Sequence, residues 1–128
     1  MSDSRAPDSP TPVELAILQV LWQRGPSTVR EIHNALKDQR DTGQSTTLKM
    51  IQVMTEKGLV LKDESVRPQV YSPARPAEQT QLQLIDELIQ RAFGGSASDL
   101  VLRAASAKRI TPKELAEIKK LIERAKGR

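Results

Sequence analysis

The stretch STTLKMIQVMTEKGLVLKDESVRPQVYSP, residues 45–73, changes its hydrophobic period partway along, and this change decides the fold. In its first part, core-type side chains recur at steps of three and four from Thr47 to Met54. That spacing predicts a helix with one buried face. Gly58 is suited to the left-handed conformation that commonly ends a helix.

After Gly58 the pattern becomes typical of strands. LVLKD and QVYSP are short runs rich in β-branched, aromatic and other apolar residues, and ESVRP separates them. Two such runs joined by a polar turn predict a β-hairpin with Arg67 at its exposed tip.

Two further helices are predicted before this stretch. TPVELAILQVLWQRGP opens with Thr11 and Glu14 at the spacing of a capping box, and STVREIHNALKDQR repeats that spacing with Thr28 and Glu31. The buried stripe expected on the first helix consists of Leu15, Leu18, Leu21 and Trp22.

Three helices followed by a two-stranded hairpin indicate a winged helix-turn-helix domain over residues 11–75. In that architecture the last helix before the hairpin enters the DNA major groove, and the hairpin reaches the phosphate backbone. Residues 1–10 are polar, contain proline and show no periodicity, so we expect a disordered tail there.

The predicted recognition helix, residues 45–57, carries few ordinary surface residues opposite its core stripe. Glutamine can pair with adenine, lysine with guanine or phosphate, threonine with either, and exposed Leu or Val can cover a thymine methyl. A solvated face without a partner is the alternative. The candidate DNA-reading residues are Ser45, Thr46, Leu48, Lys49, Gln52 and Val53.

Candidate phosphate contacts are Arg67 at the hairpin tip, and Arg30 and Lys57 as weaker candidates. The formal charge is +4, but residues 1–75 hold ten basic and nine acidic side chains, and residues 76–128 hold ten and seven. Bulk charge therefore does not identify a nucleic-acid partner, and a few placed cations would have to make the contacts. The alternative for each cation is an ordinary solvated charge.

Residues 76–128 predict three further helices with apolar stripes. A core of about 50 residues is too small to stand alone, since domains near that size bury only about 60% of their surface. A second copy in a two-fold dimer would complete it; folding back on the first domain in a monomer is the alternative. The candidate dimerisation residues are Leu82, Ile85, Leu88, Ile89, Phe93, Leu100, Leu115, Ile118, Leu121 and Ile122.

Composition excludes several kinds of chemistry. The sequence has no cysteine and one histidine, His33, which we interpret as an ordinary helix-surface residue. We expect that the protein is not an enzyme and has neither a metal site nor a cofactor. No apolar run is long enough to span a membrane and no leader pattern is present, so a cytoplasmic protein without membrane insertion is expected.

ELAILQVLWQRGPSTVREIHNAL, STTLKMIQVMTEKGLV and YSPA resemble the DNA-binding half of the BlaI/MecI penicillinase-repressor family of winged-helix regulators. FGGSASDLVLRAA and ITPKELAEIKKLIERA resemble its C-terminal dimerisation segment, so the likeness covers about residues 11–126. Val53 stands where the family usually has a basic residue, and the cysteine motif of its copper-responsive branch is absent.

The resemblance implies a dimeric repressor on palindromic operator DNA, relieved by a membrane-bound sensor peptidase. In the family the cut falls at an Asn-Phe bond that aligns here with Arg103 and Ala104, the candidate cleavage position. Because these residues differ, we expect either a sensor of different specificity or release without cleavage at that bond. The alternative function is a helical protein-interaction module on a winged-helix scaffold that does not bind DNA directly.

Overall fold

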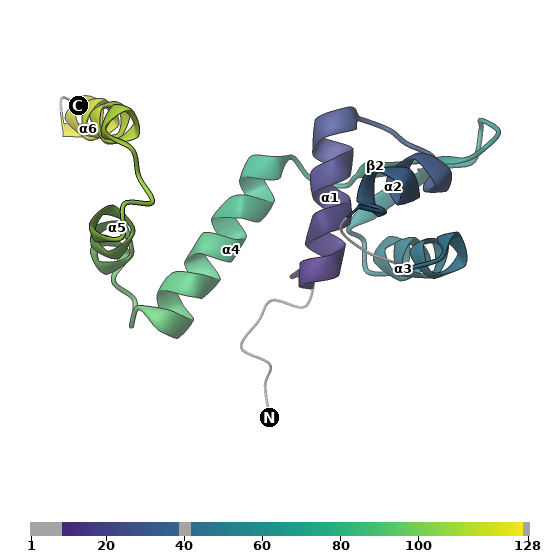
Figure 1. Ribbon diagram of the computed structural model, residues 1–128, viewed down its shortest axis with the longest axis horizontal. Coiled ribbons are helices and arrows are strands. Elements are labelled where there is room, and N and C mark those ends of the chain that lie inside the picture. The colour runs from purple at the N-terminus through teal and green to yellow at the C-terminus, as the bar shows by residue number, and fades with distance from the viewer. Residues whose placement is uncertain (1–8, 39–41, 127–128) are drawn as a thin grey trace. The chain divides into compact units, whose positions relative to one another are not determined.

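The computed structural model describes residues 9–38 and 42–126, which form six helices and one β-hairpin (Figure 1). The described residues divide into two compact units, with the boundary between Leu84 and Ile85. The elements are α1 (Pro12–Arg24), α2 (Val29–Leu36), α3 (Gln44–Glu56), β1 (Val60–Asp63), β2 (Val70–Pro73), α4 (Ala77–Ala92), α5 (Ala97–Ser106) and α6 (Pro112–Lys126). The predicted fold class, a mainly helical protein with a winged helix-turn-helix followed by further helices, is confirmed.

Capping boxes begin the first two helices, as the sequence predicts. The Thr11 side chain accepts from the Glu14 backbone N–H, and the Glu14 carboxylate accepts from the Thr11 N–H. Thr28 and Glu31 repeat this arrangement at the start of α2. Gly25, with φ of 84°, ends α1.

The buried face of α1 differs from the predicted stripe. Ile17 and Val20 are buried with Leu18 and Leu21, whereas Leu15 and Trp22 are only half-buried. The reason is that α1 contacts α2, α3 and β2, so it buries a wider face than a single stripe. Trp22 lies toward the segment that leads into α4, where its indole N–H donates to the Arg75 carbonyl at 3.1 Å.

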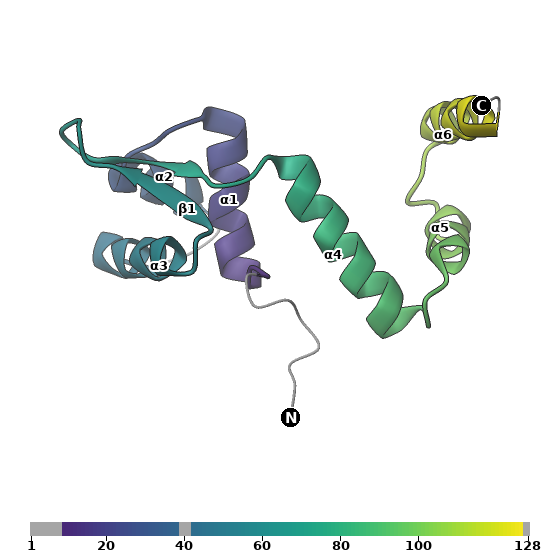
Figure 2. The same cartoon turned by 180° about the vertical axis from the view of Figure 1, so that it is seen from behind.

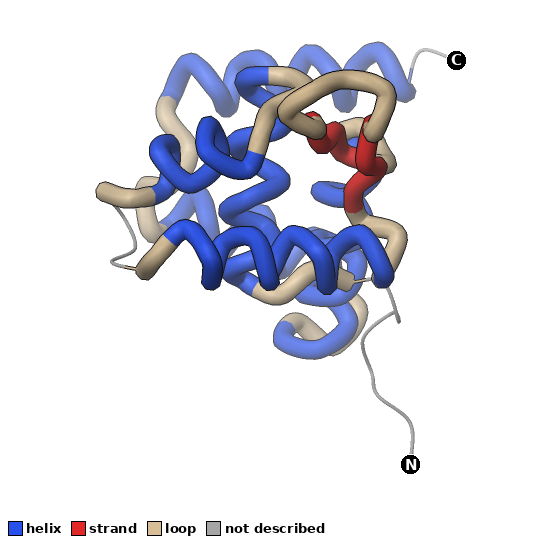
Figure 3. Tube along the Cα trace, turned by 90° about the vertical axis from the view of Figure 1, so that its right-hand side faces the viewer, coloured by secondary structure: helices blue, strands red, loops and turns tan. Residues whose placement is uncertain are grey.

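The hairpin forms where the period-two pattern predicts it. β1 and β2 form an antiparallel pair, drawn in red in Figure 3. Val60 pairs with Pro73 and Lys62 with Tyr71. Tyr71 also exchanges two backbone hydrogen bonds with Ser27, of 3.0 and 2.8 Å, in the turn between α1 and α2. The loop that joins the strands projects away from α1 (Figures 1 and 2).

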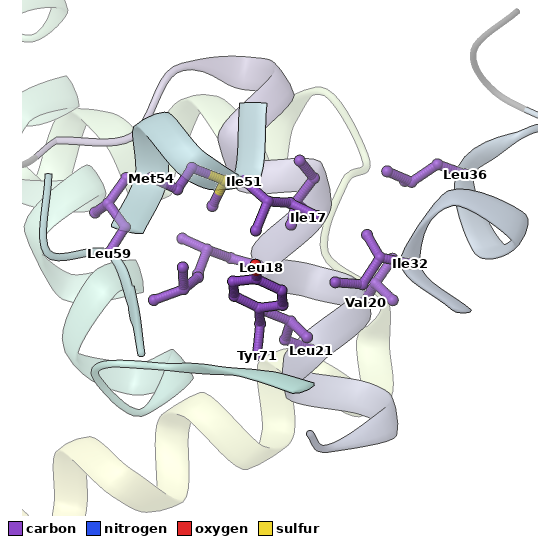
Figure 4. Packing of buried hydrophobic residues seen from close by; sticks show 11 residues of the cluster. Ile17, Leu18, Val20, Leu21, Ile32, Leu36, Ile51, Met54, Leu59 and Tyr71 are labelled. Carbon is purple, nitrogen blue, oxygen red and sulfur yellow. The ribbon is translucent and has the colours of Figure 1, made fainter. Parts of the chain in front are cut away.

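An aliphatic core with one tyrosine holds the first unit together (Figure 4). α3 contributes Ile51 and Met54, and β2 contributes the Tyr71 ring, which lies close to Leu18 and Leu21 of α1. The remaining buried apolar side chains are Ile17, Val20, Ile32, Leu36, Leu59 and Val60. Ser9 and Pro10, predicted to lie in a disordered tail, are buried instead. The rest of the predicted tail, residues 1–8, lies outside the described residues.

The second unit consists of helices with polar caps and little buried surface. Ser96 accepts from the Asp99 N–H at the start of α5, and Thr111 and Glu114 form a further box before α6. Among described residues from 85 onward, none is buried in the single chain. These helices thus leave their apolar faces largely uncovered.

Candidate nucleic-acid interface

The outer face of α3 is exposed along the length of the helix. Thr47, Ile51 and Met54 are buried and Met50 packs against the core. The opposite side of the helix therefore faces solvent. Leu48 is 37% exposed and Val53 is 43% exposed, although both are apolar. All six candidate reading residues lie on this outer face: Ser45, Thr46, Leu48, Lys49, Gln52 and Val53.

The hairpin loop places a cation beside the first turns of α3. Arg67 is exposed, and its Nη1 donates to the Glu64 carbonyl at 3.0 Å, which holds the side chain against its own loop. Arg67, Arg30 of α2 and Leu48 of α3 all line a hollow of about 510 Å³. Two of the predicted phosphate contacts therefore lie close to the predicted reading face.

The first turn of the hairpin loop is held by Asp63. Its carboxylate accepts from the Ser65 hydroxyl and from the Ser65 backbone N–H. These hydrogen bonds lower the pKa of Asp63 below its ordinary value. The bond from the hydroxyl has the larger effect, and the bond from the backbone N–H the smaller one.

Lys57, a weaker candidate for a phosphate contact, forms an ion pair within the protein. Its ammonium donates to both carboxylate oxygens of Glu14 at 2.9 Å, so the end of α3 is joined to the start of α1. The Glu14 side chain is 9% exposed and the Lys57 side chain 32% exposed. The charge of Lys57 is thus paired with a carboxylate of the protein itself, which makes it less available for a phosphate.

His33 also has a role that the sequence does not reveal. Its Nδ1 lies 3.0 Å from the hydroxyl of Thr47, which is buried on the inner side of α3. His33 is half-buried, so interpreting it as an ordinary surface residue is incomplete. Thr47 has a recognisable place in the core stripe, but nothing in the sequence identifies its partner on the preceding helix.

The predicted dimerisation residues remain accessible in the single chain. Six of them are between 41% and 60% exposed: Leu82, Ile85, Leu88, Leu115, Leu121 and Ile122. Ile89, Phe93, Leu100 and Ile118 are half-buried. Val101 and Leu102 of α5 are exposed as well and were not among the predicted residues.

The candidate cleavage position lies inside α5. Arg103 is exposed and Ala104 is half-buried. Across residues 9–38 and 42–126, no group of three or more His, Cys, Asp or Glu side chains is placed to hold a metal ion. No helix in those ranges has the length and apolar character needed to cross a membrane.

The three-helix unit, the hairpin and the exposed α3 face define a winged helix-turn-helix protein. The chain belongs to the penicillinase repressor family, whose model matches residues 10–124, which confirms the resemblance. Members of that family are transcriptional regulators rather than enzymes.

Two similar proteins are both named transcriptional regulator BlaI, from two strains of Mycobacterium tuberculosis. Each is 34% identical to this chain over 86 residues, which is 66% of the chain and 62% of the relative. The match thus spans a little under two thirds of the length of these relatives.

Proposed function

We propose that this protein is a transcriptional repressor that binds a palindromic operator as a dimer, with α3 in the major groove. The observation that carries the proposal is the outer face of α3. Its exposed side chains are hydrogen-bonding and small apolar types, and Arg30 and Arg67 stand around the hollow at its first turns. Membership of a repressor family supports the same function.

The proposed reading roles follow from side-chain chemistry. Gln52 can donate to and accept from adenine in a bidentate contact, and Lys49 can donate to guanine or to a phosphate. Leu48 and Val53 offer apolar surface to thymine methyl groups, while Ser45 and Thr46 supply hydroxyls. Arg67 and Arg30 are the proposed phosphate contacts, and Lys57 is left out of that set because Glu14 holds it.

A second copy of the chain is the proposed cover for the exposed apolar side chains of α4, α5 and α6. A monomer that leaves six Leu and Ile side chains between 41% and 60% exposed gives up much of their hydrophobic stabilisation. In a two-fold dimer, these apolar side chains of each subunit would be buried against those of its partner. It would also present two α3 helices to half-sites about 34 Å apart, or a multiple of that distance.

Relief of repression is proposed to act on this dimer. The family resemblance suggests cleavage by a membrane-bound sensor peptidase in α5, at or near Arg103 and Ala104. A peptide bond inside a helix must unwind before it fits the extended site of a protease. The alternative is that the protein leaves its operator without cleavage at that bond.

The test is a selection from random duplex DNA by the full-length protein, followed by titration of the enriched duplex over a range of salt concentrations. We expect a palindromic sequence to be enriched, with an affinity that falls steeply as salt rises. Gln52→Ala should weaken binding, and Gln79→Ala is a matched control because Gln79 is exposed on α4, outside the proposed interface. Absence of any enriched sequence would contradict the proposal and favour a protein-interaction module.

A further inference from the structure

The ion pair between Lys57 and Glu14 joins the junction of α3 and the hairpin to α1. Lys57 follows the last residue of α3, and its backbone N–H donates to the Val53 carbonyl at 2.9 Å. The chain turns at Gly58, with φ of 80°, and then enters β1. Whatever fixes Lys57 therefore fixes the junction between the recognition helix and the hairpin.

Glu14 is well suited to hold that junction. It is nearly buried, and its Oε1 accepts both from the Thr11 N–H at 2.9 Å and from the Lys57 ammonium at 2.9 Å. Oε2 accepts from the same ammonium at 2.9 Å. Because the capping box already orders the Glu14 side chain, Lys57 meets a carboxylate whose position is set before the pair forms.

A second polar contact restrains the other half of α3. Thr47 is buried and lies 3.0 Å from His33 Nδ1 on α2. Thr47 and Lys57 are ten residues apart, which is about 15 Å along a helix. Two restraints at that separation limit both the tilt of α3 and its rotation about its own axis.

We propose that Lys57 is a positioning residue for base reading: through Glu14 it sets the orientation of α3, and it does not contact a DNA phosphate. This inference rests on the proposed function. Side chains extend about 5–6 Å from a helix axis, so a rotation of 10° moves their tips by about 1 Å. A bidentate contact to a base tolerates less than that, because N–H···O distances fall between about 2.7 and 3.2 Å.

The chain offers variants that separate positioning from phosphate contact. Lys57→Met removes the charge and keeps a long apolar stem, while Lys57→Arg keeps the ionic partner of Glu14. Glu14→Gln removes the carboxylate charge but keeps the capping box, since Gln also serves at that position. Arg30→Gln is the control for a proposed phosphate contact, because Arg30 is exposed on α2.

The experiment measures binding of each full-length variant to the duplex that the wild type selects and to a scrambled duplex, over a range of salt concentrations. We expect Lys57→Met and Glu14→Gln to weaken binding to the selected duplex by about tenfold per half-site, or about a hundredfold for a dimer. Binding to the scrambled duplex and the salt slope should stay at the wild-type values, and Lys57→Arg should keep most of the wild-type affinity. Arg30→Gln should instead lower the salt slope by about one unit per subunit.

The possible results separate the two proposals. If Lys57→Met weakens both duplexes equally and lowers the salt slope as Arg30→Gln does, Lys57 contacts phosphate and the inference is wrong. If Lys57→Met fails to fold, Glu14→Gln decides alone: wild-type selectivity in that variant would overturn the positioning role. If the wild type selects no sequence, the proposed function fails first and the inference falls with it.

Discussion

Ile122→Asp tests whether the exposed apolar face of the C-terminal helices is the dimer interface. Ile122 lies on α6 and is 53% exposed in the single chain. The substitution should leave the isolated subunit folded, because surface changes away from special features usually alter stability by less than about 0.5 kcal/mol. Its main effect should fall on association.

The magnitude follows from the half of the side chain that a partner would cover. Full burial of an isoleucine contributes about 1.5–3 kcal/mol, so covering the exposed half contributes about 1 kcal/mol, or about 2 kcal/mol over both copies. Burying a carboxylate there adds a desolvation cost of a few kcal/mol per copy. A combined loss of about 6 kcal/mol weakens the dimer dissociation constant by about ten-thousandfold.

Sedimentation of the full-length protein at micromolar concentrations measures this effect directly. Leu61→Asp is the matched control, because Leu61 is 58% exposed but lies on β1, outside the predicted dimer face. The wild type and Leu61→Asp should sediment as dimers and Ile122→Asp as a monomer. A wild type that is monomeric, or an Ile122→Asp variant that remains dimeric, would refute the reasoning.

Four further outcomes are expected. Gln52→Ala should reduce affinity for the selected operator by about 1–3 kcal/mol per half-site and relax the preference at one base pair, measured across operator variants; equal binding by variant and wild type would remove Gln52 from the reading set. Arg67→Ala should weaken specific and non-specific DNA about equally and lower the salt slope by about one unit per subunit, whereas a loss confined to one sequence would place Arg67 in a groove. Residues 1–103 expressed alone should sediment as monomers, and their affinity for the full operator should fall by about 100-fold or more, because the two DNA-binding units are no longer linked. A truncated chain that stays dimeric and binds as tightly as the full protein would exclude the proposed role of the removed segment. Because the pKa of Asp63 is lowered in the folded loop, the ionised carboxylate stabilises the loop at neutral pH, and this effect is lost as pH falls through the lowered pKa. In Ser65→Ala, NMR titration should show the pKa of Asp63 returning toward the ordinary aspartate value. An unchanged pKa would contradict the role of the hydroxyl.

Local signals predicted most of the helices and the hairpin. Thr11 with Glu14, and Thr28 with Glu31, begin helices in the structure because a capping box is formed by residues three apart and needs no distant partner. The predicted recognition helix at 45–57 is observed as α3 from Gln44 to Glu56, a shift of one residue at each end. Such shifts are ordinary, since helix ends fray.

Contacts between residues that are far apart in the sequence could not be predicted from local patterns. The sequence predicts Glu14 as part of a cap, but its ionic partner lies 43 residues away, and periodicity gives no information about such pairs. The spacing of Trp22 predicts a place in the buried stripe. Its indole N–H instead donates to the carbonyl of Arg75, which lies beyond the hairpin in the sequence. The exposed outer face of α3 could be predicted because it consists of the residues that the core side of the same helix does not use. Its role in reading DNA stays a prediction.

The backbone pairing between Ser27 and Tyr71 bears on the entropy of binding. Those two hydrogen bonds fasten β2 to the turn between α1 and α2, so the base of the hairpin is ordered before any DNA arrives. Fixing the backbone of one residue costs about 1–2 kcal/mol, so ordering the eight residues of β1 and β2 costs about 8–16 kcal/mol. Folding has already met that cost, so under the proposed function the loop between the strands, and not the strands themselves, would lose conformational freedom if Arg67 contacts the phosphate backbone.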